Sequence, residues 1–341
     1  MLNHIKHKED YINFGEWVTN YLKHNSIITP KVVCDYFGIT LSGALGKINN
    51  EGVRHLFHIQ EYVLEHTIKD LLDANKISYK LHDRTVIKPY ELDFLLNNIA
   101  IETNDITSHY LKDVNYHSMK TDLCNQKGIR LIHLFEWEFK NKKLIPWLLD
   151  TLLDKKYIIG ARKCEVKIVN PKVAKDFINK YHLQGSNRKY LINIGLFYNS
   201  ELLSVMSFDK PRFNTNYDIE ILRYATKFGF SIIGGAQKLF KYFLNNYNYK
   251  KIITYSDKSK FTGDVYKRLG FIQLKDTPPS AVYVNSDLQI ISWKALNDLG
   301  ADKLIKTNYG KGSNNEDVLY KNGYMKVYNC GNYKFEYIRK E

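Results

Sequence analysis

The sequence predicts a multidomain α+β protein, and three observations lead to this class. A chain of 341 residues is long enough for two or three domains with their own cores. Helical periodicity alone fills the first part of the chain, whereas later segments alternate between helical patterns and short strand patterns bounded by turn signals. We therefore expect a helical domain at 1–57, a mixed-sheet domain at 58–155 and an α/β domain at 160–341.

The composition favours a polyanionic partner. Fifty Lys and Arg residues against 36 Asp and Glu give a net charge of +14, which suits double-stranded DNA. The 26 Tyr residues could stack on bases, although AT-rich codon usage enriches Lys, Ile, Asn and Tyr without any functional cause. Four cysteines without a CxxC pair argue against a zinc module or a disulfide framework. No apolar run has the length of a signal peptide or membrane span, so we expect a soluble intracellular protein with no membrane partner.

The first domain reads as short helices that could form a helix-turn-helix. Thr29-Pro30 is a helix start, and Gly38 interrupts the apolar stripe before a second helix. In a DNA-binding helix-turn-helix, the exposed face of the second helix would carry Ser42, Lys47 and Asn50 toward a major groove. A plain helical hairpin gives the same pattern.

The second domain starts with a longer helix, predicted over 59–75. Glu65 lies at the edge of its apolar stripe, from where an acidic side chain can extend across the surface of a neighbouring sheet. A solvated boundary residue, or a partner for a Lys or Arg, would give the same pattern.

A β-hairpin follows, and it organises the rest of the domain. The runs 91–96 and 99–104 flank Asn97-Asn98, and Asn tolerates the positive φ of a tight turn. A two-residue loop places Asp93 opposite Glu102 on one face of the sheet. Two adjacent carboxylates repel each other unless a cation lies between them, and hard divalent ions take such oxygen ligands. The hairpin therefore predicts a Mg²⁺ (or Mn²⁺) site for phosphodiester hydrolysis; the alternative is an edge hairpin whose acids face water.

Polar residues with catalytic potential come after the hairpin. His109 and His117 could supply a proton to a leaving oxygen or orient a water, although a surface His is more often inert. A helix predicted over 116–126 contains Lys120, and a strand is expected over 129–135. One continuous helix is then expected from Glu136 to Leu153.

The third domain begins after a change of pattern at 154–163. Its expected elements are a helix over 171–181, strands over 192–198, 201–208, 220–224 and 252–255, and a terminal β-hairpin around Asn329–Gly331. Gly234, Gly235 and Ala236 open another helix, whose N–H groups could receive phosphate oxygens, although this motif is short.

Several short segments between residues 59 and 150 share an order known from one nuclease family. They are Glu65, Arg84, Glu91-Leu92-Asp93, IETN with His109, Lys120, the strand KGIRLIH, and Glu136-Trp137-Glu138. Their order and spacing resemble the very-short-patch-repair-like branch of the PD-(D/E)XK nucleases, which includes phage homing endonucleases. The resemblance implies catalytic Asp93, supported by Glu65 and His109, with Glu102 and Asn104 beside them. Arg84 is expected to contact DNA.

Two features depart from that family. Asn104 stands where the superfamily has the Lys of its E-x-K motif, so His109, His117 or Lys120 could take over its role. The aromatic-plus-Gly text usual before the His is replaced by 105–108.

Residues from about 165 to 300 carry two further matching segments, SIIGGAQKLFKYF and YSDKSKFTGDVYKRLGF. They resemble an acetyltransferase-type (GNAT-like) domain of the kind found in phage Mom-like DNA modification proteins. The first segment departs from the usual acyl-CoA loop, which is longer and richer in basic and Gly positions. We therefore expect the fold, and do not expect acetyl-CoA as a cofactor.

Together these features predict a metal-dependent DNA endonuclease of the phage homing type, acting in the cytoplasm of the infected bacterial cell. The N-terminal helical domain and the basic C-terminal domain would bind DNA largely through its phosphates. The alternatives are an acyl-CoA-dependent acyltransferase that modifies DNA bases and a catalytically inactive DNA-binding regulator. Whether the protein forms a homodimer is left open.

Overall fold

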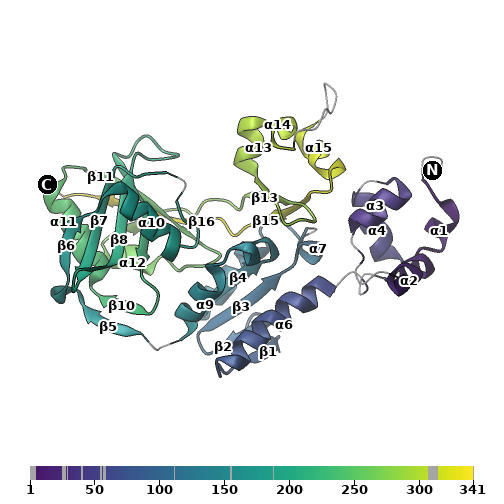
Figure 1. Ribbon diagram of the computed structural model, residues 1–341, viewed down its shortest axis with the longest axis horizontal. Coiled ribbons are helices and arrows are strands. Elements are labelled where there is room, and N and C mark those ends of the chain that lie inside the picture. Colours follow the sequence, from purple (N-terminus) through teal and green to yellow (C-terminus); the bar gives the residue numbers. More distant parts are fainter. Residues whose placement is uncertain are drawn as a thin grey trace. The chain divides into compact units, whose positions relative to one another are not determined.

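The chain divides into two compact units, shown in the ribbon of the computed structural model (Figure 1). The structure describes residues 5–24, 28, 30–39, 41–53, 56, 59–110, 112–153, 156–186, 188–305 and 314–340. The first unit comprises Met1–Trp137 and Pro279–Cys330, and the second comprises Glu138–Pro278 and Gly331–Glu341. This division differs from the three expected ranges, because the segment 279–330 packs with the first unit while the last strand returns to the second.

The N-terminal part of the first unit is helical. Its helices are α1 (Lys8–Ile12), α2 (Phe14–His24), α3 (Pro30–Phe37) and α4 (Leu41–Asn50). Phe14 and Phe37 are fully buried, and Trp17 packs against both rings. Gly38 has a φ of 65°, which ends α3 as a C-terminal Gly does. Helices α3 and α4 are therefore present on either side of Gly38, as both the helix-turn-helix and the plain hairpin interpretation require.

A mixed four-stranded sheet with helices against it forms the centre of the first unit. Its elements are α6 (Ile59–Ala74), β1 (Lys80–Asp83), β2 (Leu92–Leu96), β3 (Ile99–Asn104), α7 (Ile106–His109), α8 (Tyr116–Gln126) and β4 (Arg130–Phe135). The strand order is β1-β2-β3-β4, with β3 and β4 parallel and the other pairs antiparallel. The predicted hairpin register is confirmed, because Leu96 pairs with Ile99 and Phe94 with Ile101. Asn97 has the positive φ, 38°, that the turn requires.

The predicted continuous helix from Glu136 to Leu153 is wrong. A 3₁₀ helix, η1 (Glu136–Lys140), is followed by a separate α9 (Leu144–Leu152). Asn141 interrupts them, since its side-chain oxygen accepts from the backbone N–H of Lys143 at 3.1 Å. Such local side-chain bonds compete with helix propagation.

The remaining part of the first unit is a small sheet with three helices. Its elements are β13 (Ala281–Val284), β14 (Ile290–Ser292), α13 (Trp293–Leu299), α14 (Ala301–Ile305), α15 (Asn315–Lys321) and β15 (Met325–Tyr328), in the strand order β14-β13-β15.

The terminal β-hairpin predicted around Asn329–Gly331 is wrong. β15 pairs with β13, whereas β16 (Asn332–Ile338) pairs with β11 (Lys251–Asp257) and β12 (Ile272–Gln273). Alternation and a Gly-containing turn describe two strands, but they do not say which strands complete each ladder.

The second unit is built on a seven-stranded sheet in the order β12-β16-β11-β9-β8-β7-β6. Its other elements are β5 (Tyr157–Gly160), η2 (Ala161–Lys163), β6 (Glu165–Ile168), α10 (Pro171–Tyr181), β7 (Ile192–Tyr198), β8 (Glu201–Asp209), β9 (Ile219–Thr226), β10 (Phe230–Ile233), α11 (Gly235–Asn246) and α12 (Asp264–Arg268). β5 and β10 form a separate parallel pair. The turn of the predicted β7–β8 hairpin has positive φ at both Asn199 and Ser200, 48° and 65°.

Helices α10 and α11 cover opposite faces of this sheet. Val205 of β8 packs in one buried cluster with Phe177 of α10, and the next residue, Met206, packs in another with Phe243 of α11. Successive side chains of a strand point to opposite faces, so β8 is covered on both sides. No helix among the described residues of either unit is long and apolar enough to span a bilayer.

The sheet of the second unit contains one parallel pair, β9 with β11. These strands pair only from Ile219 with Ile252 to Ile221 with Thr254, although β9 continues to Thr226. The two strands therefore part beyond this point, and no β-strand in the described part of the chain pairs with the later β9 residues on that side.

Candidate functional site

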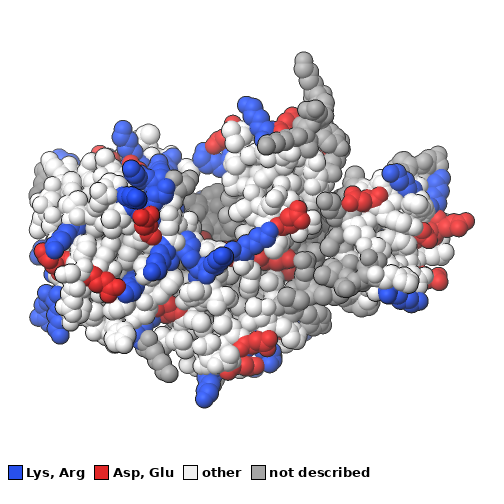
Figure 2. Space-filling view, in the orientation of Figure 1, with Lys and Arg blue, Asp and Glu red and all other residues white. Residues whose placement is uncertain are grey.

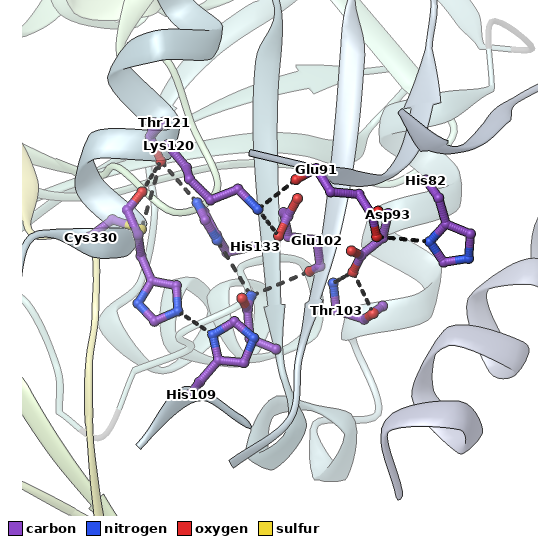
Figure 3. Close-up of polar contacts among 12 residues, drawn as sticks. His82, Glu91, Asp93, Glu102, Thr103, His109, Lys120, Thr121, His133 and Cys330 are labelled. Atoms are coloured by element: carbon purple, nitrogen blue, oxygen red, sulfur yellow. Dashed lines mark hydrogen bonds and ion pairs between the residues drawn. The ribbon is translucent and has the colours of Figure 1, made fainter. Parts of the chain in front are cut away.

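The β2–β3 hairpin holds two carboxylates in different hydrogen-bond environments, as Figure 3 shows. One oxygen of Asp93, Oδ2, accepts from the backbone N–H and the hydroxyl of Thr103, both at 2.7 Å. One oxygen of Glu102, Oε2, accepts from the ammonium of Lys120 at 2.5 Å. Lys120 reaches over from α8 and also donates to the main-chain oxygen of Glu91 at 2.8 Å. The helix thus brings a cation to the acids of the hairpin.

Burial dominates the electrostatics of these groups. It raises the pKa of Glu102 to about 8, with a further contribution from the charge of Asp93 and an opposing one from Lys120. Burial also raises the pKa of Asp93. For Lys120 burial lowers the pKa, but the nearby Glu102 and Tyr116 outweigh it and the net shift is upward. The ammonium is therefore charged, while Glu102 binds a proton more readily than an exposed glutamate.

Two buried oxygens at this place have no hydrogen-bond partner among the described residues: Oε1 of Glu102 and Oδ1 of Asn104. Both residues are almost fully buried, at 3% and 1% exposure. Buried acceptors are nearly always satisfied in folded proteins, so an unpartnered pair marks a place for a water or an ion.

Glu65 joins the acids through His82. Its Oε1 lies 3.1 Å from Nε2 of His82, and the other ring nitrogen lies 3.1 Å from Oε1 of Glu91. Burial raises the pKa of Glu65, His82 opposes this, and the charge of Asp93 adds to it. The structure therefore brings Glu65 to the same group of acids as Asp93. Arg84 is bound to Glu91, with Nε 2.5 Å from Oε2, and its side chain is 77% exposed.

His109 and His117 form a neighbouring group. Nδ1 of His109 lies 2.8 Å from Nε2 of His117. Burial lowers the pKa of His117 well below the usual value, and His109 contributes further, so this imidazole is neutral. The amide nitrogen of Asn104 lies 3.4 Å from both the Glu102 carbonyl and Nδ1 of His133, at the limit of a hydrogen bond. Asn104 thus stands between the histidines and the acids.

Tyr116 also lies between the two groups. Its ring is 5.6 Å from Nζ of Lys120 and 6.0 Å from the ring of His109, centre to centre. Burial raises the pKa of its hydroxyl.

The residues of the first domain that were predicted to contact DNA differ in their contacts and exposure. The ammonium of Lys47 lies 2.6 Å from Oε1 of Glu51 and 4.7 Å from the ring centre of Tyr11. Its charge therefore already interacts with a carboxylate and an aromatic ring of the protein. Asn50 is exposed. The side chain of Ser42 lies outside the described residues.

The predicted phosphate loop opens α11 as expected. Gly234 is the N-cap residue, with a φ of 74°, and no side chain caps the helix. Gly235 is buried, and a Cβ added there would lie 3.1 Å from side-chain atoms of Ile232. Ala236 follows in the first turn, where backbone N–H groups are free of helical partners.

Four residues of this site were not among the sequence candidates: His82, Glu91, Tyr116 and His133. Glu91 precedes Asp93 by two residues, so strand alternation could have placed both on one face. Tyr116 precedes Lys120 by four residues on a helix, which also indicates a shared face. His133 pairs with Glu102 across β3 and β4, which requires the sheet order to be known.

The donor set fits a divalent ion only in part. Among the residues that the structure describes, no group of three or more His, Cys, Asp and Glu side chains is arranged to hold a metal. Asp93 and Glu102 nevertheless supply two carboxylates, and the unpartnered Oε1 of Glu102 is the atom that suits a hard cation. These two carboxylates could therefore supply only part of the ligand set of a Mg²⁺ or Mn²⁺ ion, and the rest would have to come from water or substrate oxygens.

Comparison with known proteins finds no matching family model and no matching curated protein. Among solved structures, this chain is similar to an acetyltransferase from Bacillus subtilis in complex with CoA, at 13% identity and a TM-score of 0.30. It is also similar to a GNAT family acetyltransferase from Bacillus cereus, at 10% and 0.28, and to one from Elizabethkingia anophelis with acetyl-CoA bound, at 18% and 0.27. Each similarity covers 52% of this chain and 99–100% of the other. None of the three is named as a nuclease.

Proposed function

We propose that the first unit hydrolyses phosphodiester bonds of double-stranded DNA with a divalent metal ion. The observation that carries this proposal is the buried, unpartnered Oε1 of Glu102 on the strand beside Asp93. An edge hairpin whose acids simply face water would not bury Glu102 to 3% exposure.

Asp93 and Glu102 are the residues that would hold the ion. When bound, Mg²⁺ or Mn²⁺ polarises a phosphate and lowers the pKa of an attacking water. Thr103 fixes the Asp93 carboxylate through two hydrogen bonds and leaves Oδ1 as its ligand atom. Glu65, with its raised pKa, is suited to accept the proton of the water. The neutral His117 and its partner His109 can pass a proton toward the leaving oxygen.

Lys120 is the best candidate for the role of the missing E-x-K lysine. Its ammonium lies 2.5 Å from Glu102, whereas Asn104, at the sequence position of that lysine, carries no charge. His117 is neutral and buried, which leaves it without the positive charge that the role requires. A lysine from α8 can therefore supply, beside Glu102, the charge that β3 lacks.

Plasmid cleavage tests this proposal. The full chain should nick or cut supercoiled plasmid with Mg²⁺ or Mn²⁺ and should be inactive in EDTA. Asp93→Asn keeps an acceptor for Thr103 but removes the charge, and should lower the rate by about a thousandfold. Asp70→Asn, an exposed change on α6, is the matched control. Normal cleavage by Asp93→Asn would exclude this site.

A second candidate function, binding of an acyl-CoA by the second unit, is favoured by a different observation. β9 and β11 part beyond Ile221 and Thr254, and α11, which connects them, begins at Gly234-Gly235 without a side-chain cap. An open strand edge can pair with an extended amide-containing chain, and a helix N-terminus can receive a pyrophosphate.

Calorimetry with acetyl-CoA tests the second candidate. Gln237→Glu adds a negative charge in the first turn of α11, where Gln237 is exposed. A carboxylate there stabilises the helix but repels a phosphate. We expect Tm to be kept or raised and the Kd for acetyl-CoA to rise about tenfold. No binding by the unmodified chain would contradict the candidate function, and an unchanged Kd in the variant would exclude α11 as the phosphate site.

A further inference from the structure

The basic residues of this protein are spread over its surface among acidic ones on the face drawn in Figure 2, so net charge alone marks no site. One place in the second unit differs, because two cations meet there without a carboxylate. We propose that Lys143 and Arg223, which both donate to carbonyls of the turn 182–186, form a phosphate-binding site. None of these residues belongs to the β2–β3 hairpin or to α11.

Both cations contact the same short turn. Nζ of Lys143 donates to the His182 carbonyl at 2.7 Å, and Nε of Arg223 donates to the Gly185 carbonyl at 2.8 Å. The turn is closed by the N–H of Gly185, which donates to the His182 carbonyl at 3.0 Å. A Cβ built on Gly185 would lie 3.1 Å from Nζ of Lys143. The ammonium and the guanidinium therefore bind carbonyls of one turn, in which Gly185 has a φ of 60° that favours Gly.

Neither cation contacts an acidic side chain among the described residues. Within the described part of the chain, Arg223 donates to the Gly185 carbonyl and, from Nη1 at 2.6 Å, to the Leu222 carbonyl, and Nη2 makes no hydrogen bond there. The nearest acid of β9, Glu220, is occupied by Arg212, whose Nη2 lies 2.6 Å and Nε 3.0 Å from its Oε1. Main-chain carbonyls orient Lys143 and Arg223 but do not neutralise them.

His182 adds a neutral donor at the same turn. Its Nδ1 accepts from the backbone N–H of Gln184 at 3.2 Å, so the proton of the neutral ring is on Nε2. Burial, Arg223 and Lys143 together lower the pKa of His182 to about 3. Burial also lowers the pKa of Lys143, with a contribution from Arg223, as expected where positive charge is uncompensated.

The chemistry of these groups suits a phosphate. A partly buried cation without a counter-charge is costly, and an oxyanion removes that cost. A guanidinium and an ammonium together are typical of phosphate recognition. Lys143, His182 and Arg223 are each partly exposed, so a ligand can reach them. The phosphate can belong to a DNA backbone or to a free ligand such as coenzyme A.

Binding by the full chain in EDTA, where hydrolysis is excluded, tests the site with two probes: a short fluorescein-labelled duplex and coenzyme A. Lys143→Gln and Arg223→Gln keep a donor for the turn but remove the charge. Each variant should raise the Kd about tenfold for the probe that binds this site. In Lys172→Gln, an exposed change on α10, the Kd should stay within about twofold of the value for the unmodified chain. An effect on the duplex alone assigns the site to DNA, and one on coenzyme A alone assigns it to a nucleotide-type ligand.

A second measurement uses the unmodified chain, in case a variant fails to fold. An amine-acylating reagent followed by mass spectrometry reports the reactivity of each lysine with and without the probes. The probe whose Kd rises in the variants should protect Lys143 and leave the reactivity of Lys172 unchanged. If neither probe protects Lys143 and both Kd values are unchanged in the folded variants, the two cations only fasten the turn and the proposal is overturned.

Discussion

Replacing Lys120 by Met tests the contact on which the candidate catalytic site depends most. Its side chain is 3% exposed, and its ammonium lies 2.5 Å from Oε2 of Glu102 and donates to the Glu91 carbonyl at 2.8 Å. The variant loses two hydrogen bonds from a charged donor and leaves buried acceptors without a partner. At pH 7, where Glu102 can still bind a proton, we expect the free energy of unfolding to fall by about 2 kcal/mol.

The loss should grow above pH 8. The folded pKa of Glu102, about 8, exceeds the ordinary value of 4.5. The stability contributed by its protonated form is therefore complete below pH 4.5 and declines as pH rises toward 8. Without Lys120 the folded pKa rises further, so the decline continues past pH 8 at about 1.4 kcal/mol per pH unit. The expected difference from the unmodified chain at pH 9 is about 3–4 kcal/mol.

Urea denaturation in EDTA at both pH values measures this difference, and hydrogen exchange of the β3 and α8 amides localises it to the first unit. Lys127→Met, an exposed change just after α8, is the matched control and should cost less than about 0.5 kcal/mol. In a Glu102→Gln background the pH dependence of the Lys120 effect should disappear. If Lys120→Met were as stable as Lys127→Met at both pH values, the buried ion pair would not exist.

Three further predictions concern other places in the molecule. His182→Gln should remove a pH dependence of the free energy of unfolding of about 1.4 kcal/mol per pH unit between pH 6 and 4. The pKa of His182 in the folded chain is about 3, below the ordinary 6.5, so the neutral ring stabilises the fold above this window and that stability is lost as the pH falls. An unchanged dependence of the urea midpoint on pH would contradict this. Gly331→Ala should cost about 3 kcal/mol or more in thermal unfolding, since its Cβ would lie 2.3 Å from the Thr277 carbonyl oxygen, whereas Gly128→Ala, with a similar φ but open space, should cost about 1 kcal/mol. Glu65→Gln should lower kcat for plasmid cleavage about a hundredfold without changing Tm, and an equal rate would remove Glu65 as the proton acceptor.

The residues of tight turns gave the most specific predictions of the fold from the sequence. The register of β2 and β3 follows from Asn97-Asn98, because a two-residue loop leaves one pairing and strand alternation then assigns every side chain to a face. The same reasoning gave the Asn199-Ser200 hairpin. In both places the determining residues are neighbours in the chain, so local conformational preference decides the outcome.

Only the part of the candidate site whose residues lie close together in the sequence could be predicted from it. Asp93 and Glu102 could be brought together from the sequence, whereas the contact of Lys120 with Glu102 depends on how α8 packs on the sheet. Glu65 reaches the acids only because His82, on another element, lies between it and Glu91.

What the sequence by itself determined is the type of many helices and strands and the pairing across two tight turns, since these depend on few adjacent residues. Tertiary structure alone decided that β16 joins β11 and β12 instead of β15, although alternation describes β15 and β16 equally well. It also decided that Lys143 and Arg223 meet at one turn. Such choices depend on the packing of segments far apart in the chain, where many pairings satisfy the same local pattern and only the complete core selects one.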